Sequence, residues 1–173
     1  FDGKAAILDA LRDRLLQQLM LELQQSLPKR RSVLRERSSA PNPTADHGEG
    51  SAALFLQLSQ AWWRWLALDS VRWRILLAVD QPVAARFQDV SERRDTVISV
   101  APSLLRQLCD ATVPCRDVLY AAGLSIDQAS RLQEESLVRG AGLLVLHALH
   151  TDAAGLEERF VEGLRQLLFA AGL

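Results

Sequence analysis

The sequence contains little of what builds disulfide frameworks, membrane spans or strongly charged surfaces. Only two of its 173 residues are cysteines, too few for a disulfide framework, so a reducing, cytoplasmic compartment is expected. No stretch approaches the roughly 18 uninterrupted apolar residues of a transmembrane helix, and the first residues lack the pattern of a signal peptide. The 20 basic and 21 acidic residues give a net charge of −1, which removes the usual argument for a free-standing nucleic-acid binder or a polybasic membrane-surface protein.

Residues that favour strands are also scarce, whereas residues that favour helices dominate. The chain has 32 Leu and 23 Ala against 12 Val and 4 Ile, with only 9 Gly and 6 Pro. Leu and Ala are strong helix formers, while β-branched side chains favour strands. A domain typically takes roughly 100–200 residues. We therefore expect a single all-α domain over 1–173, an antiparallel bundle of about six to eight helices.

Apolar spacing and cap residues divide the chain into expected helical stretches. The first has leucines at 8, 11, 15, 19 and 23 on one face, and Asp2 can cap it. Ser125 and Gln128 fit a capping box before a later helix, and Thr151 and Asp152 can cap the last helix. Pro102 is expected to end or kink the stretch that precedes it. The expected stretches are 4–25, 51–68, 71–79, 82–100, 104–109, 114–122, 126–150 and 153–171.

Residues 26–50 differ in composition from the rest and are predicted to form a flexible loop. The part at 38–50 has almost no apolar side chains and carries two Pro and two Gly, so burial cannot offset the entropy of ordering it. A basic run, Lys29, Arg30 and Arg31, precedes it. We interpret this run as a solvated helix end, with contact to an anionic partner as the alternative.

No catalytic or metal-binding set of residues stands out. His147 and His150 lie three residues apart on one expected helix, but no Cys, Asp or Glu on the neighbouring turn completes a metal site. Cys109 and Cys115 form no CxxC pattern, so we interpret them as buried, reduced core residues, with a redox or ligand-sensing role as the alternative. We therefore expect no enzymatic activity, no metal and no cofactor.

The four tryptophans are the most distinctive feature of the sequence. Three of them lie within four residues, and Trp73 follows one helix later. Such a density of large aromatic side chains suits either a bulky core or the wall of a cavity for an apolar ligand. Trp63 is expected to point away from this wall and to be scaffold. The candidate wall comprises Trp62, Trp65, Leu66, Trp73, Phe87, Leu105 and Tyr120.

Two glycines in the penultimate helix need a physical reason, because each costs roughly 1 kcal/mol relative to Ala inside a helix. Small residues allow two backbones to approach closely, either within one chain or between two subunits. The second reading is slightly favoured, because the final helix is also amphipathic and can complete a four-helix bundle. The candidate dimer interface comprises Leu137, Gly140, Ala141, Leu144, Ala148, Phe160, Leu164 and Leu167.

The order of these elements resembles the regulatory domain of the TetR family of transcriptional repressors. In that family a long linking helix follows a Tyr-x-His-Phe-x-x-Lys-like segment, and here Phe1, Lys4 and Leu8 stand in that relation. The stretch 122–140 resembles the family's penultimate helix, and 155–168 resembles its last helix. The resemblance covers nearly the whole chain as a loose pattern. The helix-turn-helix itself is absent from this sequence, and the polar loop at 38–50 is unusual.

The resemblance implies that this chain is the half of a repressor that binds an effector and dimerises. A small apolar or aromatic effector would bind among the middle helices, and a homodimer would form through 126–150 and 153–171. Operator DNA would be bound only by the amino-terminal domain. Effector binding would favour one spacing of the two DNA-binding heads, transmitted by the first helix, 4–25. The competing hypothesis is a helical adaptor whose tryptophans form a groove for a protein partner.

Overall fold

A computed structural model describes residues 3–28, 46–77, 102–149 and 155–173. Within these ranges the chain is helical and has no strand, which confirms the predicted all-α fold. The helices are α1 (Lys4–Ser26), α2 (Asp46–Ala67), α3 (Ser70–Leu77), α5 (Pro102–Ala111), α6 (Val113–Ala121), α7 (Ile126–Leu149) and α8 (Leu156–Ala170).

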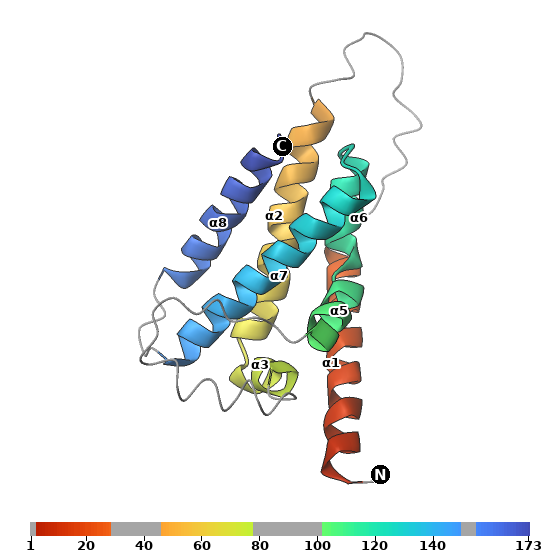
Figure 1. Cartoon of the computed structure of the whole chain (residues 1–173), viewed down its shortest axis with the longest axis vertical. Coiled ribbons are helices and arrows are strands. Elements are labelled where there is room, and N and C mark those ends of the chain that lie inside the picture. Colours follow the sequence, from red (N-terminus) through yellow and green to blue (C-terminus); the bar gives the residue numbers. More distant parts are fainter. Residues whose placement is uncertain (1–2, 29–45, 78–101, 150–154) are drawn as a thin grey trace.

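Helix α2 is the centre of the bundle, since it contacts α1, α3, α6, α7 and α8. Helices α7 and α8 run antiparallel to each other and both contact α2. Helices α1, α5 and α6 cover another side of the bundle (Figure 1). The lower half of α1 extends beyond its neighbours toward the amino terminus (Figure 1). None of the helices in the described ranges is long and apolar enough to cross a membrane.

The core follows the apolar spacing of the sequence only in part. On α1, Leu16, Leu19 and Leu23 are buried, but Leu8 and Leu11 are exposed, so the expected apolar stripe is covered over only half of its length. The reason is visible in Figure 1, where few of the described helices lie beside the first turns of α1.

Three helix boundaries differ from the expectation. Helix α2 begins at Asp46, so the expected loop at 26–50 cannot extend beyond 45. Helix α5 begins at Pro102 and not at Leu104, which suits proline because the first helical amide has no intrahelical partner; the stretch before it lies outside the described residues. Helix α8 begins at Leu156 because Gly155 before it has the left-handed φ of 80°.

One start signal is confirmed in atomic detail. The Ser125 amide donates to Oε1 of Gln128 at 3.0 Å, and the Gln128 amide donates to Oγ of Ser125 at 3.2 Å. This is the capping box expected before α7. The expected helix at 82–100, the cap residue Asp2 and the cap residues at 151–152 lie outside the described residues.

Candidate functional site

The tryptophans assigned to a cavity wall are packed into the hydrophobic core. Trp62, Trp65 and Trp73 are all buried, as is Leu66, and Trp62 retains only 1% of its exposure. The Trp62 ring meets the ring of Phe160 on α8 edge to face, with centroids 5.4 Å apart. Such a pair stabilises a core beyond its buried area. These side chains therefore act as core, which is the alternative reading of the cluster.

The other members of the expected wall have different surroundings, although Leu105 also packs against the core. Tyr120 lies on α6 with 60% of its surface exposed, and Leu105 on α5 is half-buried. Phe87 lies outside the described residues. Among the described members, exposed Tyr120 does not share a wall with the buried tryptophans, because helical spacing fixes a face of each helix but not which faces meet.

The small-residue strip on α7 has an intramolecular explanation at one of its two glycines. A Cβ atom at Gly140 would lie 2.8 Å from Cζ2 of Trp62, closer still to Cη2, and 3.1 Å from a ring carbon of Phe160. Gly140 is therefore glycine because the Trp62 indole occupies the space of a side chain. At Gly142 a Cβ would meet nothing within 4 Å.

Most of the residues assigned to a dimer interface are covered by their own chain. Their burial contradicts direct contact with a second subunit, because these side chains already pack between α2, α7 and α8. Leu167 is half-buried, and the side chain of Ala148 lies outside the described set. The buried members are Leu137, Gly140, Ala141, Leu144, Phe160 and Leu164.

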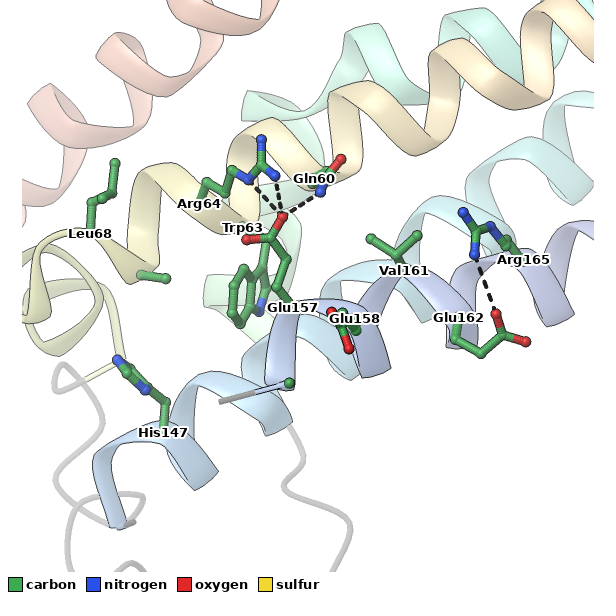
Figure 2. A pocket seen from close by; sticks show the side chains of 12 residues that line it. Gln60, Trp63, Arg64, Leu68, His147, Glu157, Glu158, Val161, Glu162 and Arg165 are labelled. Carbon is green, nitrogen blue, oxygen red and sulfur yellow. Dashed lines mark hydrogen bonds and ion pairs between the residues drawn. The ribbon is translucent and has the colours of Figure 1, made fainter. Parts of the chain in front are cut away.

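A groove opens on the outer side of the same helices. It has a volume of about 940 Å³ and lies between α2 and α8, beside the end of α7. Figure 2 shows its side chains facing one another across the two helices. We refer to it as the α2–α8 groove. Its lining comprises Gln60, Trp63, Arg64, Ala67, Leu68, His147, Gly155, Glu157, Glu158, Val161, Glu162 and Arg165.

A polar cluster, which we call the clasp, bridges the two walls of the groove. Gln60 and Arg64 are one turn apart on α2, and both donate to Oε1 of Glu157 in the first turn of α8. The Arg64 Nε bond measures 2.7 Å, and Nη2 of Arg64 forms an ion pair with the same oxygen (Figure 2). The hydrogen bond from Arg64 holds the pKa of Glu157 below its usual value, and the same bond raises the pKa of Arg64.

Two ring nitrogens in the groove lining have no hydrogen-bond partner among the described residues. Trp63 is 5% exposed and stacks on Phe160 with centroids 5.7 Å apart and planes at 21°, but its Nε1 has no acceptor. His147, near the end of α7, has a buried Nδ1 without a partner. Both nitrogens are screened from solvent, and Nε1 of Trp62 in the core is unpaired in the same way, so these atoms do not mark the groove as a site.

The groove has more anionic than cationic side chains. Arg64 pairs with Glu157, and Arg165 lies 3.5 Å from Glu162. Glu158 is exposed on the same helix and pairs with no cation of the described residues. The groove therefore presents two cationic and three anionic side chains, with one carboxylate left over.

The cysteines behave as their apolar surroundings require. Burial raises the pKa of the Cys115 thiol to about 12, so it stays protonated at neutral pH. Burial also raises the pKa of Cys109, which is half-buried. No three His, Cys, Asp or Glu side chains gather closely enough to hold a metal in the part of the chain that the structure describes.

Sequence reasoning missed the groove and identified other residues as the site. Glu157 lies more than 90 positions from Gln60 and Arg64, and no local pattern predicts that it meets them. The available signals were weak: polar residues one turn apart on an otherwise apolar helix, and acidic residues in a first turn. Comparison with protein-family models, curated proteins and solved structures found no significant match.

Proposed function

We propose that this chain is the regulatory half of a ligand-responsive transcriptional regulator that resembles the TetR family. In this proposal it binds a small effector with an apolar or aromatic body and forms a homodimer. A domain outside this sequence binds the operator. The effector site is the α2–α8 groove in place of the tryptophan core expected from the sequence.

The observation that carries this proposal is the groove itself. Its volume of about 940 Å³ lies in the range of small-molecule sites, roughly 300–1,000 Å³. Trp63, Leu68 and Val161 give it apolar walls. A ligand there contacts α2 and α8 together, so it can change how these two helices pack against α7 and hence the geometry of a dimer that uses α7.

A dimer in this proposal uses the outer side of α7. Val138, Gly142 and Leu146 are spaced at four residues, and each is at least partly exposed. The open space at Gly142 allows a close approach of a second backbone. We expect Leu146→Arg to yield a monomer by light scattering, because a charge would be desolvated at the two-fold contact. Leu21→Arg, at an exposed leucine of α1, is the control and should leave the dimer intact.

The effector site is tested by thermal shift with a panel of aromatic compounds. A ligand should raise the melting temperature of the wild-type protein by mass action. Val161→Trp fills the groove and should remove the shift. A panel in which no compound stabilises the protein, together with a monomeric wild type, would refute the regulatory proposal.

The second candidate is a helical interaction module, which one observation favours. Ile7, Leu8 and Leu11 are exposed on the free half of α1, an apolar surface that a protein partner could cover. This candidate predicts a monomer that responds to no small compound. Light scattering and the thermal-shift panel therefore distinguish the two candidate functions.

A further inference from the structure

We propose that the outer face of α1 is a self-association surface, on which a second copy of this chain lays its own α1 in the antiparallel direction. This inference goes beyond the proposed function and does not depend on it, because it uses a contact separate from the dimer proposed on α7. It is supported by the apolar side chains of this face, by their spacing and by the charges at its two ends.

Helix α1 has apolar side chains on two faces, and its own chain buries only one of them. The inner face packs the leucines at 16, 19 and 23 into the core. Single exposed leucines are ordinary on a protein surface, but an apolar stripe along one helix is typical of a contact surface. The exposed apolar residues of the outer face retain 40–52% of their surface, and they are Ile7 46%, Leu8 40%, Leu11 42% and Leu21 52%.

The spacing of the outer face is that of two paired helices. Its central line has residues alternately four and three positions apart, as in the heptad pattern of a coiled coil. We call this line the α1 seam. Leucines occupy most of its middle, and a charged residue stands at each end. The α1 seam comprises Lys4, Leu8, Leu11, Leu15, Gln18 and Glu22.

The α1 seam matches a reversed copy of itself. In an antiparallel pair centred at residue 13, each residue lies opposite the one equally far beyond the centre. The two-fold symmetry of such a pair makes every contact twice. Beside the seam, Ile7 approaches Leu21 of the second copy, so both exposed flanking residues are covered. The opposed pairs within the seam are Lys4 with Glu22, Leu8 with Gln18 and Leu11 with Leu15.

The charges at the two ends of the seam lack partners in their own chain. Lys4 and Glu22 are exposed, and neither forms an ion pair with another described residue. They cannot meet each other, because they are about 27 Å apart along the helix at 1.5 Å per residue. In the antiparallel pair, Lys4 of each copy lies opposite Glu22 of the other, which gives two ion pairs.

These two charges are also placed unfavourably within α1 itself. Lys4 is the first residue of the helix, and Glu22 lies one turn before its last residue. The helix dipole favours acidic residues at the start and basic residues at the end, and α1 has neither in its first or last turn. An antiparallel neighbour offsets this cost, because it brings an opposite charge to each end.

The self-match of the seam identifies the partner as a second copy. An unrelated protein could cover the same apolar stripe without any correspondence between the two halves of the seam. One helix from each copy covers less surface than a stable interface, which buries roughly 1,200–2,000 Å². We therefore expect a weak pair that forms as the protein concentration rises.

The experiment measures the dissociation constant of the pair by sedimentation equilibrium, in a chain that carries Leu146→Arg. That substitution removes the proposed α7 contact and leaves only the α1 seam. Lys4→Glu and Glu22→Lys should each weaken the pair about three- to tenfold, because each sets like charges opposite one another at both ends. The two changes together should restore the original dissociation constant, because opposite charges then meet again.

Two further variants control for folding and for net charge. Asp13→Lys reverses an exposed charge on the opposite side of α1 and should leave the dissociation constant unchanged. Leu11→Arg, at an exposed position near the centre of the seam, should abolish the pair without unfolding the chain. Circular dichroism checks that every variant keeps its helical content.

The outcomes decide both the partner and its direction. A monomer at every concentration, or a pair that survives Leu11→Arg, would overturn the proposal and leave the face to another protein. Recovery in the Lys4→Glu, Glu22→Lys double variant would support the antiparallel match. Two single variants that weaken the pair without recovery in the double variant would overturn it.

Discussion

The two sides of α2 meet α8 in opposite ways. On the inner side, Trp62 packs against Gly140 and Phe160 without space for one further carbon atom. On the outer side the same helices border the α2–α8 groove, and the clasp bridges its two walls. Trp62 and Trp63 both pack on Phe160, but only Trp63 of the two also lines the groove, because a helix turns about 100° per residue and neighbouring side chains point in different directions. The inner side should determine stability, and the outer side should determine binding.

The largest expected effect tests the inner side. Trp62→Ala should lower the free energy of unfolding by about 3–5 kcal/mol, because it removes a fully buried ring and leaves a cavity against Phe160. Denaturant titration followed by circular dichroism measures this change. Tyr120→Ala is the aromatic control, and at its exposed position it should change stability by no more than about 0.5 kcal/mol. Similar losses in both variants would contradict the division into a packed and an open side.

A pair of glycines sharpens the comparison on α7. Gly140→Ala should destabilise the fold by about 1–3 kcal/mol, because the rigid Trp62 ring must move to admit a Cβ. Gly142→Ala, two residues away in a place without contacts in its own chain, should stabilise the monomeric Leu146→Arg protein by about 0.5–1 kcal/mol through helix propensity. Thermal and denaturant unfolding measure the change in the free energy of unfolding, which should be a loss for Gly140→Ala and a gain for Gly142→Ala.

A double variant tests whether the Trp62 ring causes the cost of Gly140→Ala. In the Trp62→Ala background, Gly140→Ala should lose most of its cost, since the clashing ring is gone. A cost that persists there would mean that Gly140 is required for another reason than the indole.

The fold could be predicted from the sequence because its signals are local. Leu and Ala content predicted the helices, and the Ser125–Gln128 capping box set the start of α7 to the residue. The errors at α2 and α8 also have local causes. The helix at Asp46 begins within a polar, glycine-containing stretch, and the left-handed Gly155 delays the start of α8 until after two candidate caps.

The site could not be predicted, because it depends on which helix faces meet. Spacing placed Trp62 and Trp65 on one face of α2, but whether that face borders a cavity or a ring from α8 is decided over about 100 residues of separation. The glycine at 140 needed a reason, yet the sequence could not decide between a second subunit and an indole of the same chain. Trp63, expected as scaffold, lines the groove.

The smallest expected effect concerns the clasp on the outer side. Its ion pair is largely solvated, so Glu157→Gln should cost no more than about 1 kcal/mol of stability at pH 7. Because the hydrogen bond from Arg64 holds the pKa of folded Glu157 below its ordinary value of 4.5, the clasp stabilises the protein above that pH. Its contribution is lost as the pH falls through the folded pKa. The difference in unfolding free energy between wild type and variant should therefore shrink below about pH 4.5 and disappear in stronger acid.

Glu162→Gln provides the matched control for this titration. Glu162 lies on the same helix and in the same groove, but its oxygen is 3.5 Å from Arg165 and both side chains are mostly exposed. Its replacement should change stability less than Glu157→Gln at pH 7. If the two variants lost equal stability, the clasp would be one more surface ion pair and not a bridge that holds α2 and α8 together. If the Glu157→Gln loss greatly exceeded 1 kcal/mol, the outer side would contribute to stability as a core does, and the contrast between the two sides of α2 would fail.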